Sequence, residues 1–422
     1  MKTKLPGVLI IGGGVAGASA ASKLAEHGVE TWLVERKPYI GGYAAELGCK
    51  AADVCLKCNV CVAHDIFRSA LTNKKTHVLA ECQVVSLDGE GDAKPAYQAK
   101  LTQNPQYINH DLCTACGACL KACPAKCIYQ PYPGIYGGRP LIEWSKCLRS
   151  KGKKCNKCFS ACNFGAINLA AKSRQITVPV DAVVVAVGYQ PFDPGINQAY
   201  GYKTVPNVIT GLEAERQLAA TRKIIRHSDG QPPKRIAFIQ CVGSRSEQVH
   251  RRPEDTNYCS TVCCAYAMRT ARKLKHANPD AAITIFYMDL QNFGKNFTAF
   301  YREGMKGVKF IRARPSEVAA SASGNVLIKY EERDKGVVQQ EEYDLVVLSI
   351  GMRPAEDFPF LADRLRIPLD EYGFFGLKQA AGLADTQKNN IFVIGACEAP
   401  KDIASSIGQA AAVCAEIISL KK

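Results

Sequence analysis

The sequence lacks several features that define common classes of protein. None of its apolar runs is long enough to cross a bilayer as a helix, which needs about 20 apolar residues. It has no low-complexity tract, and its first apolar run leads directly into a glycine loop, unlike the layout of a signal peptide. We therefore expect a protein that is globular throughout, has no direct membrane span and lies in the reducing cytoplasm.

Sequence patterns of nucleic-acid recognition are also missing. The sequence contains no helix-turn-helix, zinc-finger or RNA-binding pattern, although 54 Lys and Arg against 39 Asp and Glu give a net charge of +15. Bound anionic cofactors would bring negative charge, so part of this excess would compensate them. We expect no nucleic-acid partner. No Ser-His-Asp arrangement or general-acid pair stands out either, so substrate chemistry is expected at a bound cofactor or in another subunit.

Cysteine, in contrast, is abundant, with 20 in 422 residues, and nine of them lie between residues 107 and 169. The first array reads Cys113-x2-Cys116-x2-Cys119-x3-Cys123-Pro124, which is a ferredoxin spacing for [4Fe-4S] clusters. In such arrays three ligands come from one loop, and the fourth crosses to the other cluster. We therefore predict one cluster on Cys113, Cys116, Cys119 and Cys162, and a second on Cys147, Cys155, Cys158 and Cys123.

The second half of this block departs from the ferredoxin pattern in two ways. Seven residues separate Cys147 from Cys155 and include a basic insertion, and Asn163 follows the last cysteine where a proline is usual. Structural zinc and disulfides are the alternatives. The Cys-Pro ending and the pairing of two arrays favour iron-sulfur clusters over zinc.

The first 35 residues read strand, glycine turn, helix and strand. Val8 to Ile11 is an apolar strand, the glycines of Gly12-x-Gly14-x-x-Gly17 follow, and the next strand ends in Glu35. Glycines allow the backbone to approach a pyrophosphate at a helix N-terminus, and the acid can bind a ribose hydroxyl. A dinucleotide site is predicted here.

The surrounding stretches favour FAD over NAD. The pair Gly41-Gly42 resembles the second phosphate-side loop of flavoproteins with two dinucleotide-binding domains. Residues 183–188 and 391–396 resemble the strand-and-turn segments that complete their flavin site, and a helix starting near Ile403 would aim its N-terminus at the flavin ring. The candidate FAD-binding residues are Gly12, Gly14, Gly17, Glu35, Arg36, Gly41, Gly42, Gly188, Gly395 and Ile403.

Two further cysteine sets lie outside the ferredoxin-like block. The set Cys49-x5-Cys55-x2-Cys58-x2-Cys61 is interpreted as another cluster near the flavin, with a redox disulfide of Cys55 and Cys58 as the alternative. The other set comprises Cys241, Cys259, Cys263 and Cys264. We favour a non-standard cluster there over a pair of buried thiols on the helix that runs to Lys275.

The second of these sets stands where a nicotinamide site would be expected. A second nucleotide-binding-like unit starts with the strand Arg235 to Gln240, which runs into Cys241-Val242-Gly243-Ser244-Arg245 instead of a GxGxxG loop. We therefore predict that this unit does not bind NAD(P)H. Residues 206–230 are expected to form an amphipathic helix with a basic end, residues 308–344 are expected to be mostly sheet, and Leu345 to Ile350 are expected to return to the flavin domain.

Nearly the whole chain resembles the A-type flavoprotein of heterodisulfide reductase. The resemblance also extends to the A-type proteins of the quinone-interacting membrane-bound oxidoreductase, of sulfur-oxidising complexes and of the tungsten benzoyl-CoA reductase complex. Its most specific stretches are residues 238–245, Tyr258-Cys259-Ser260 with Cys263-Cys264, residues 285–289 and 400–403. Longer members carry additional terminal modules that this sequence does not contain.

The resemblance implies a fold, cofactors and partners. The fold class is α/β, a thioredoxin-reductase-like flavoprotein with two dinucleotide-binding domains and an inserted ferredoxin-like α+β domain that holds two clusters. The implied cofactors are FAD and [4Fe-4S] clusters, two in the insertion and one or two elsewhere. The implied partners are B- and C-like subunits of heterodisulfide reductase or of the quinone-interacting complex. A homodimer and membrane association through a partner are left open.

These observations predict the following organisation and function. The FAD domain occupies 1–106, 171–190 and 345–422, the ferredoxin-like insertion 107–170, and a degenerate NAD(P)-type domain 191–344. The predicted protein is an oxidoreductase subunit that relays or splits electrons between the flavin, an iron-sulfur chain and its partners. The alternatives are a stand-alone NAD(P)H-dependent flavin disulfide reductase and a non-enzymatic scaffold that relays electrons.

Overall fold

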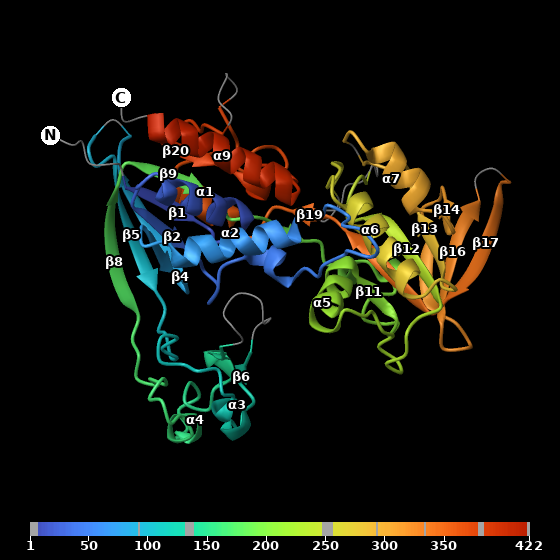
Figure 1. The fold of residues 1–422 in the computed structure, drawn as a ribbon, viewed down its shortest axis with the longest axis horizontal. Helices are drawn as coiled ribbons and strands as arrows, with labels where there is room; N and C mark the ends of the chain where they lie inside the picture. The colour runs from blue at the N-terminus through green and yellow to red at the C-terminus, as the bar shows by residue number, and fades with distance from the viewer. Residues whose placement is uncertain are drawn as a thin grey trace.

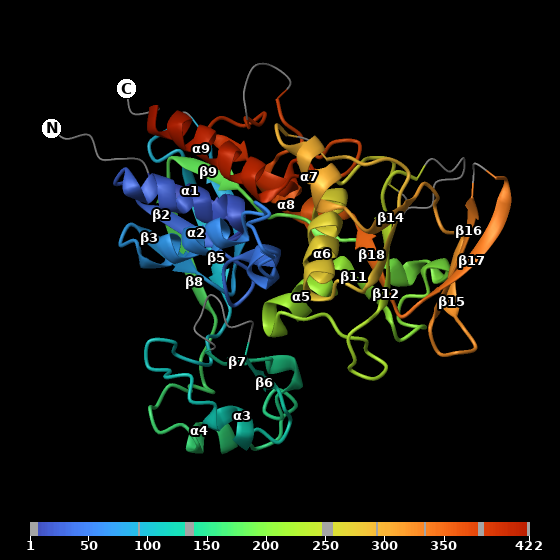
Figure 2. The same cartoon turned by 45° about the vertical axis from the view of Figure 1, so that its right-hand side comes forward.

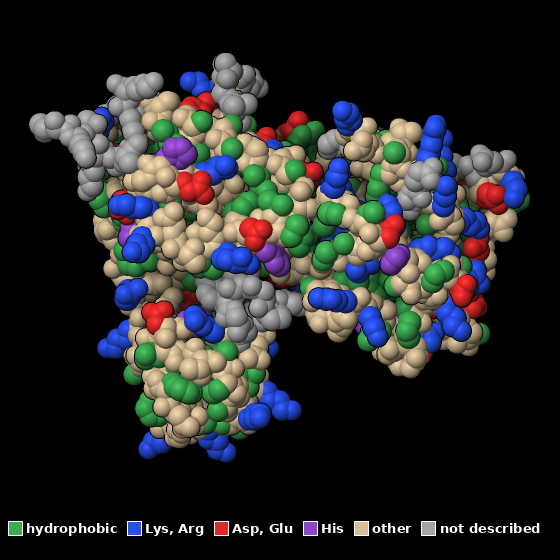
Figure 3. Space-filling view, viewed as in Figure 1, with side chains coloured by type: hydrophobic (Ala, Val, Ile, Leu, Met, Phe, Trp, Pro, Cys, Tyr) green, Lys and Arg blue, Asp and Glu red, His purple; other side chains and the backbone are tan. Residues whose placement is uncertain are grey.

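The computed structural model describes residues 7–91, 93–130, 139–246, 256–292, 294–332, 335–378 and 384–419. Two α/β lobes lie side by side, and a small cysteine-rich part projects from the first lobe (Figures 1 and 2). On the face shown in Figure 3, Lys and Arg side chains are spread over both lobes and the projecting part. Within the described residues, no helix combines the length and apolar character needed to cross a membrane.

The first lobe is built on a parallel sheet of strand order β20-β9-β1-β2-β3. Its strands read as short apolar runs because both faces of the sheet are covered. Their bounds are β1 (Val8–Ile11), β2 (Thr31–Val34), β3 (Thr76–Leu79), β9 (Ala182–Val185) and β20 (Ile391–Val393). One face carries α1 (Val15–Glu26), α2 (Val60–Thr72) and α9 (Ile403–Ser419), with α1 packed between the other two.

The opposite face of this sheet is covered by an antiparallel three-stranded sheet and one helix. A second apolar core fills the space between the two sheets. The covering elements are β4 (Cys82–Gly89), β5 (Tyr97–Gln103), β8 (Arg174–Val180) and α8 (Phe358–Leu365). The first lobe therefore has three layers, helices, parallel sheet and antiparallel sheet.

The second lobe repeats the layered plan of the first. Its parallel sheet has the order β11-β18-β12-β13-β14, beside an antiparallel sheet of order β15-β16-β17. The parallel strands are β11 (Val208–Thr210), β12 (Arg235–Val242), β13 (Ala282–Phe286), β14 (Val308–Ile311) and β18 (Leu345–Ile350). The antiparallel strands are β15 (Glu317–Ala320), β16 (Val326–Glu332) and β17 (Val337–Tyr343). The helices are α5 (Gly211–Thr221), α6 (Cys263–Ala277) and α7 (Phe297–Gly304).

Two expectations about the second lobe are wrong. The strand that begins at Leu345 does not return to the first lobe, because β18 pairs with both β11 and β12. The lobes are instead joined by the two-residue strands β10 (Gln190–Pro191) and β19 (Met352–Arg353), which pair with each other. The helix expected within 206–230 covers only α5, because Thr210 caps its start and the left-handed Arg222 ends it.

The cysteine-rich part is inserted between β5 and β8, whose ends pair with each other. Gln103 at the end of β5 lies opposite Arg174 at the start of β8, and within the insertion Ile108 bridges to Ile167. Its short elements are α3 (Ala118–Ala122), β6 (Ile128–Tyr129), β7 (Leu141–Ile142) and α4 (Lys157–Ser160). Its core consists largely of cysteine side chains and isoleucines rather than of helix or sheet faces.

Candidate flavin and iron-sulfur sites

A cavity of about 450 Å³ lies where the two lobes meet, at the carboxyl ends of β1 and β9. This position suits a dinucleotide in an open α/β sheet, and the volume lies in the usual range for ligand sites. Eight of the ten predicted FAD residues line it: Gly12, Gly14, Glu35, Arg36, Gly41, Gly42, Gly188 and Ile403.

The glycine loop presents bare backbone to this cavity. Gly12 has φ +105°, and a Cβ there would lie 2.4 Å from the carbonyl oxygen of Ala186. A Cβ on Gly14 would meet no atom within 4 Å, and no side chain caps helix α1 at this residue. The first backbone N–H groups of α1 therefore lack a side-chain cap, which suits an anionic pyrophosphate.

The other two predicted glycines, Gly17 and Gly395, lie behind the cavity wall and permit close packing. A Cβ on Gly17 would lie 1.9 Å from the carbonyl oxygen of Gly12, so glycine is needed for α1 to pack on its own loop. A Cβ on Gly395 would lie 2.7 Å from the Cβ of Ala16. Both residues shape the site without lining it.

Glu35 directly follows β2 and organises the loop around it. Its side chain is 7% exposed. One carboxylate oxygen accepts the N–H of Gly13 at 2.8 Å, and the other accepts the N–H of Lys37 at 2.7 Å. The carboxylate thus fixes the glycine loop as well as lining the cavity. The neighbouring Arg36 pairs with Asp357 of the segment before α8.

Helix α9 begins at Ile403, as the sequence indicates, and its first turn borders the cavity. The side chain of Asp402 accepts the N–H of Ser405 at 2.7 Å. One N-terminal N–H is therefore already satisfied within the chain, and the helix dipole remains as its contribution to the site.

Several wall residues come from distant segments that the sequence analysis did not select. Lys50 and Glu215 form a buried ion pair on the wall, and Tyr189 and Tyr266 contribute aromatic surface. Burial raises the pKa of both tyrosines, so they remain neutral. The only sequence signal that could identify Glu215 as a wall residue is its position one helical turn after Gly211. No sequence feature indicates that its partner is Lys50.

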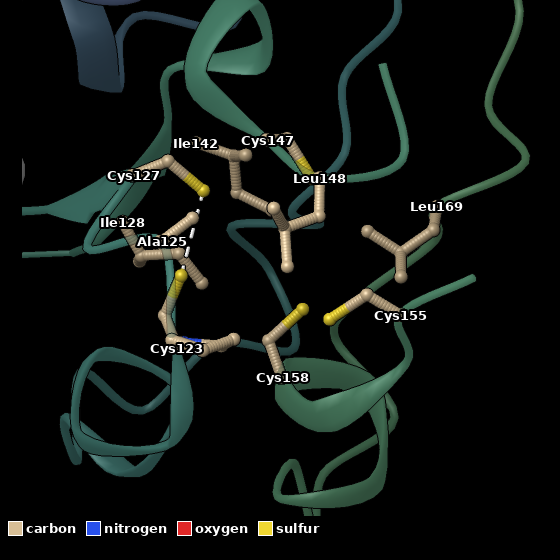
Figure 4. Close-up of a pocket in the computed structure, with 11 residues that line it drawn as sticks. Cys123, Ala125, Cys127, Ile128, Ile142, Cys147, Leu148, Cys155, Cys158 and Leu169 are labelled. Carbon is tan, nitrogen blue, oxygen red and sulfur yellow. Dashed lines mark hydrogen bonds between the residues drawn. The ribbon is translucent and has the colours of Figure 1, made fainter. Parts of the chain in front are cut away.

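The cysteine-rich part contains two small hollows of about 10 and 20 Å³, each partly open to solvent, and each is lined by one of the predicted ligand sets. The first set lines one hollow: Cys113, Cys116, Cys119 and Cys162. The second set lines the other: Cys123, Cys147, Cys155 and Cys158 (Figure 4). Cys123 of the first array thus lies in the hollow of the second ligand set, and Cys162 of the second array lies in the hollow of the first.

Each of these hollows is surrounded by four thiol side chains held on tightly wound loops. Ala115 and Gly117 both have positive φ, which wraps the first loop tightly around its hollow. Among the described residues, no three or more His, Cys, Asp or Glu side chains converge as ligands of a single metal ion. Thiol side chains around a hollow, rather than around a point, are the donor set that a cubane needs.

The set of Cys241, Cys259, Cys263 and Cys264 converges at the start of α6. Cys241 lies near the end of β12 with φ +59°, and Cys263 and Cys264 are the first two residues of the helix. Burial raises the pKa of Cys263, and the nearby thiols of the other three raise it further. The intervening Thr261 and Val262 line the flavin cavity, so this set borders it.

The set between Cys49 and Cys61 also reaches this cavity. Cys58 is half-buried and lines it, whereas Cys49, Cys55 and Cys61 are exposed. Helix α6 holds this loop by two hydrogen bonds to backbone carbonyls, from Arg269 to Leu56 at 2.9 Å and from Lys273 to Ala51 at 3.0 Å.

Comparisons with known proteins agree with the expected cofactors. A family model for FAD-dependent oxidoreductases matches residues 7–68, and one for 4Fe-4S binding domains matches residues 107–129. FAD and 4Fe-4S clusters are the cofactors of this chain. The T. acidophilum thioredoxin reductase superposes with a TM-score of 0.53 at 13% identity, covering 99% of this chain and 98% of that one. The thioredoxin-reductase-like fold is thereby confirmed.

Curated relatives match almost the whole length. The chain is 34% identical over 96% of its length to the A-type protein of the H2:CoB-CoM heterodisulfide,ferredoxin reductase of Methanothermobacter marburgensis, and 36% identical over 96% to an A-type iron-sulfur protein of the CoB-CoM heterodisulfide reductase of Methanopyrus kandleri. It covers 62% and 63% of those two proteins. The chain is therefore a homologue of the A subunits of heterodisulfide reductases, and it spans less than two thirds of their length.

Proposed function

We propose that this chain is an electron-transfer subunit that exchanges electrons between FAD and iron-sulfur clusters and passes them to partner subunits. The observation that carries this proposal is that two cysteine sets reach the flavin cavity, one through Cys58 and the other through Thr261 and Val262. Bound FAD would supply the exchange between electron pairs and single electrons. The partners that fit best are B- and C-like subunits of heterodisulfide reductase or of related complexes.

The residues of the chain have definite tasks in this proposal. The N-terminus of α1 and the glycine loop would bind the pyrophosphate, and Glu35 would hold that loop and a ribose hydroxyl. Tyr189, Tyr266 and the first turn of α6 would exclude water from the cavity. The four thiols at the start of α6 and the four between Cys49 and Cys61 would be cluster ligands, and the hydrogen bonds around their sulfurs would tune the potentials.

The second lobe supports a donor other than NAD(P)H. In a nicotinamide-binding domain the loop after the first strand approaches the pyrophosphate. Here Gly243 follows β12, and a Cβ on it would lie 2.1 Å from the ring of Phe192, so a side chain already packs on this loop. The helix α6 begins only at Cys263, well beyond the loop.

The second candidate is a flavin disulfide reductase that uses Cys55 and Cys58 as a dithiol. The position of Cys58 on the cavity wall favours it. Two further cysteines, Cys49 and Cys61, lie in the same loop, and a dithiol does not need them. Replacing Cys58 by serine separates the candidates. If Cys58 is a cluster ligand, the variant should lose iron, whereas if Cys58 is a redox thiol, the variant should keep its iron and lose only disulfide turnover.

The test of the main proposal is cofactor analysis of anaerobically purified protein. Iron, acid-labile sulfide and FAD are counted per chain, and reduction is followed by absorbance and EPR with dithionite and, separately, with NAD(P)H. One FAD and three or more cubanes that dithionite reduces and NAD(P)H does not would support the electron-transfer subunit. Rapid bleaching by NAD(P)H with two cubanes would refute it in favour of a self-sufficient reductase.

A further inference from the structure

The hollow lined by Cys123, Cys147, Cys155 and Cys158 contains a fifth cysteine that no ligand set uses. The side chain of Cys127 is 3% exposed, and its sulfur lies 3.4 Å from the sulfur of Cys123. Figure 4 shows these two sulfurs pointing toward each other across one side of the hollow. A cubane takes four protein ligands, so one of the five sulfurs has another role.

An internal repeat identifies Cys127 as the additional sulfur. The stretch Cys123-Pro124-Ala125-Lys126-Cys127-Ile128 corresponds to Cys162-Asn163-Phe164-Gly165-Ala166-Ile167. Both form the same turn: the N–H of Lys126 bonds to the Cys123 carbonyl at 3.2 Å, and that of Gly165 to the Cys162 carbonyl at 3.3 Å.

The fourth residue of each stretch has positive φ, +47° at Lys126 and +61° at Gly165. The repeat therefore places Cys127 and Ala166 at equivalent positions, each buried and each lining its own hollow. The two hollows have the same turn, but at this position one has the thiol of Cys127 and the other has the methyl group of Ala166.

We propose that Cys127 is not a ligand but donates an S–H hydrogen bond to the ligating sulfur of Cys123, and so raises the reduction potential of that cluster above that of its neighbour. The proposal rests on the proposed function, because it needs clusters in both hollows. Two sulfurs at 3.4 Å are in contact, too close to be ligands of two different irons of one cubane.

Such a bond affects electron flow because the cluster carries more negative charge when it is reduced. A donor to a ligand sulfur stabilises the more negative, reduced cluster more than the oxidised one, so the potential rises. The first hollow has only the methyl of Ala166 at the same place. One electron on the first cluster would therefore move favourably to the second, which gives the pair a direction.

The experiment uses three variants of the full chain, purified anaerobically: Cys127→Ala, Cys127→Ser and Ala166→Cys. Iron and sulfide are counted, and each cluster is titrated by EPR against a series of set potentials. Cys127→Ala should keep the iron content. At a fixed potential, the reduced-to-oxidised ratio of the second cluster should fall by about threefold to tenfold, which corresponds to a reduction potential lower by roughly 30–59 mV for one electron.

The other two variants make the test specific. Cys127→Ser keeps a donor and should stay at or above the wild-type potential, and Ala166→Cys should raise the potential of the other cluster. Loss of iron in Cys127→Ala would show that Cys127 is a ligand and overturn the proposal, as would unchanged potentials. Wild-type protein without clusters would refute the proposed function together with this inference, whereas two clusters with unchanged potentials refute only the inference.

Discussion

Lys50 and Glu215 form an ion pair at 2.7 Å across the junction of the two lobes, with side chains 3% and 5% exposed. The backbone N–H of Gly48 donates to the same carboxylate at 3.2 Å, and the Lys50 ammonium donates to the Gly48 carbonyl at 3.1 Å. A second pair, Arg216 with Glu46 at 2.7 Å, lies beside it. Helix α5 thus holds the segment that leads into the cysteine loop.

Removing one member of the buried pair should cost far more than removing both. Lys50→Met leaves the Glu215 carboxylate buried without its partner, and we expect a loss of about 3–5 kcal/mol in the free energy of unfolding. The double variant Lys50→Met with Glu215→Leu should recover most of this loss. Denaturant unfolding monitored by flavin fluorescence measures both.

A matched control is the exposed pair of Lys100 with Asp88, whose side chains are 57% and 53% exposed. Lys100→Met should leave the free energy of unfolding almost unchanged, because an exposed ion pair contributes little to stability. Equal effects of the two Lys→Met changes would contradict the role given to the buried pair.

Glu35 should determine flavin retention through the glycine loop. Glu35→Ala removes the acceptor of the Gly13 N–H, a charge-assisted bond worth about 1.5–3 kcal/mol, so FAD should bind roughly 10- to 100-fold more weakly. Equilibrium dialysis of FAD with apoprotein measures this. Glu26→Ala, at the exposed end of α1, is the control. FAD affinity equal in both variants would show that the carboxylate does not support the site.

The crossed ligand sets predict which cluster each cysteine variant loses. Cys162→Ala should remove the cluster of the first hollow, although Cys162 belongs to the second array, and Cys158→Ala should remove the other. Each variant should lose about one cubane of iron and one distinct EPR signal. Loss of the same signal in both variants would show that the arrays bind their clusters separately.

Glu341 predicts how the second lobe responds to acid. Burial tends to raise the pKa of its carboxyl, but hydrogen bonds from Lys309 at 2.9 Å, Tyr330 at 2.7 Å and Tyr343 at 2.9 Å prevail and lower it. A lowered pKa in the folded state contributes stability above the unfolded-state value of about 4.3 and loses it as the pH falls.

The corresponding test is thermal unfolding from neutral pH down to about pH 3. Glu341→Gln should destabilise the protein at neutral pH and make its melting temperature less dependent on pH below about 5. The exposed Glu317→Gln should leave the wild-type profile unchanged. A Glu341→Gln profile parallel to that of the wild type would contradict the lowered pKa.

The parts of the site that the sequence predicted depend on local pattern. Gly12, Gly14 and Glu35 lie within one strand-turn-helix-strand unit, and Cys113 to Cys123 within one loop, so their spacing alone indicates how they lie together. The expectation that the strand from Leu345 lies in the flavin domain is wrong because an all-apolar strand fits any parallel sheet, and its pairing with β12 is set by distant residues. The Lys50–Glu215 pair was missed for the same reason.

Because the cysteine-rich part is inserted between the paired strands β5 and β8, we expect that it can be deleted without disturbing the first lobe. Its two ends leave the first lobe at Gln103 and Arg174, which face each other in an antiparallel pair. A two-residue Asn-Gly turn could therefore join them as an ordinary hairpin. We expect such a shortened chain to fold and to retain FAD, so that reactions of the flavin can be observed without the two ferredoxin-like clusters.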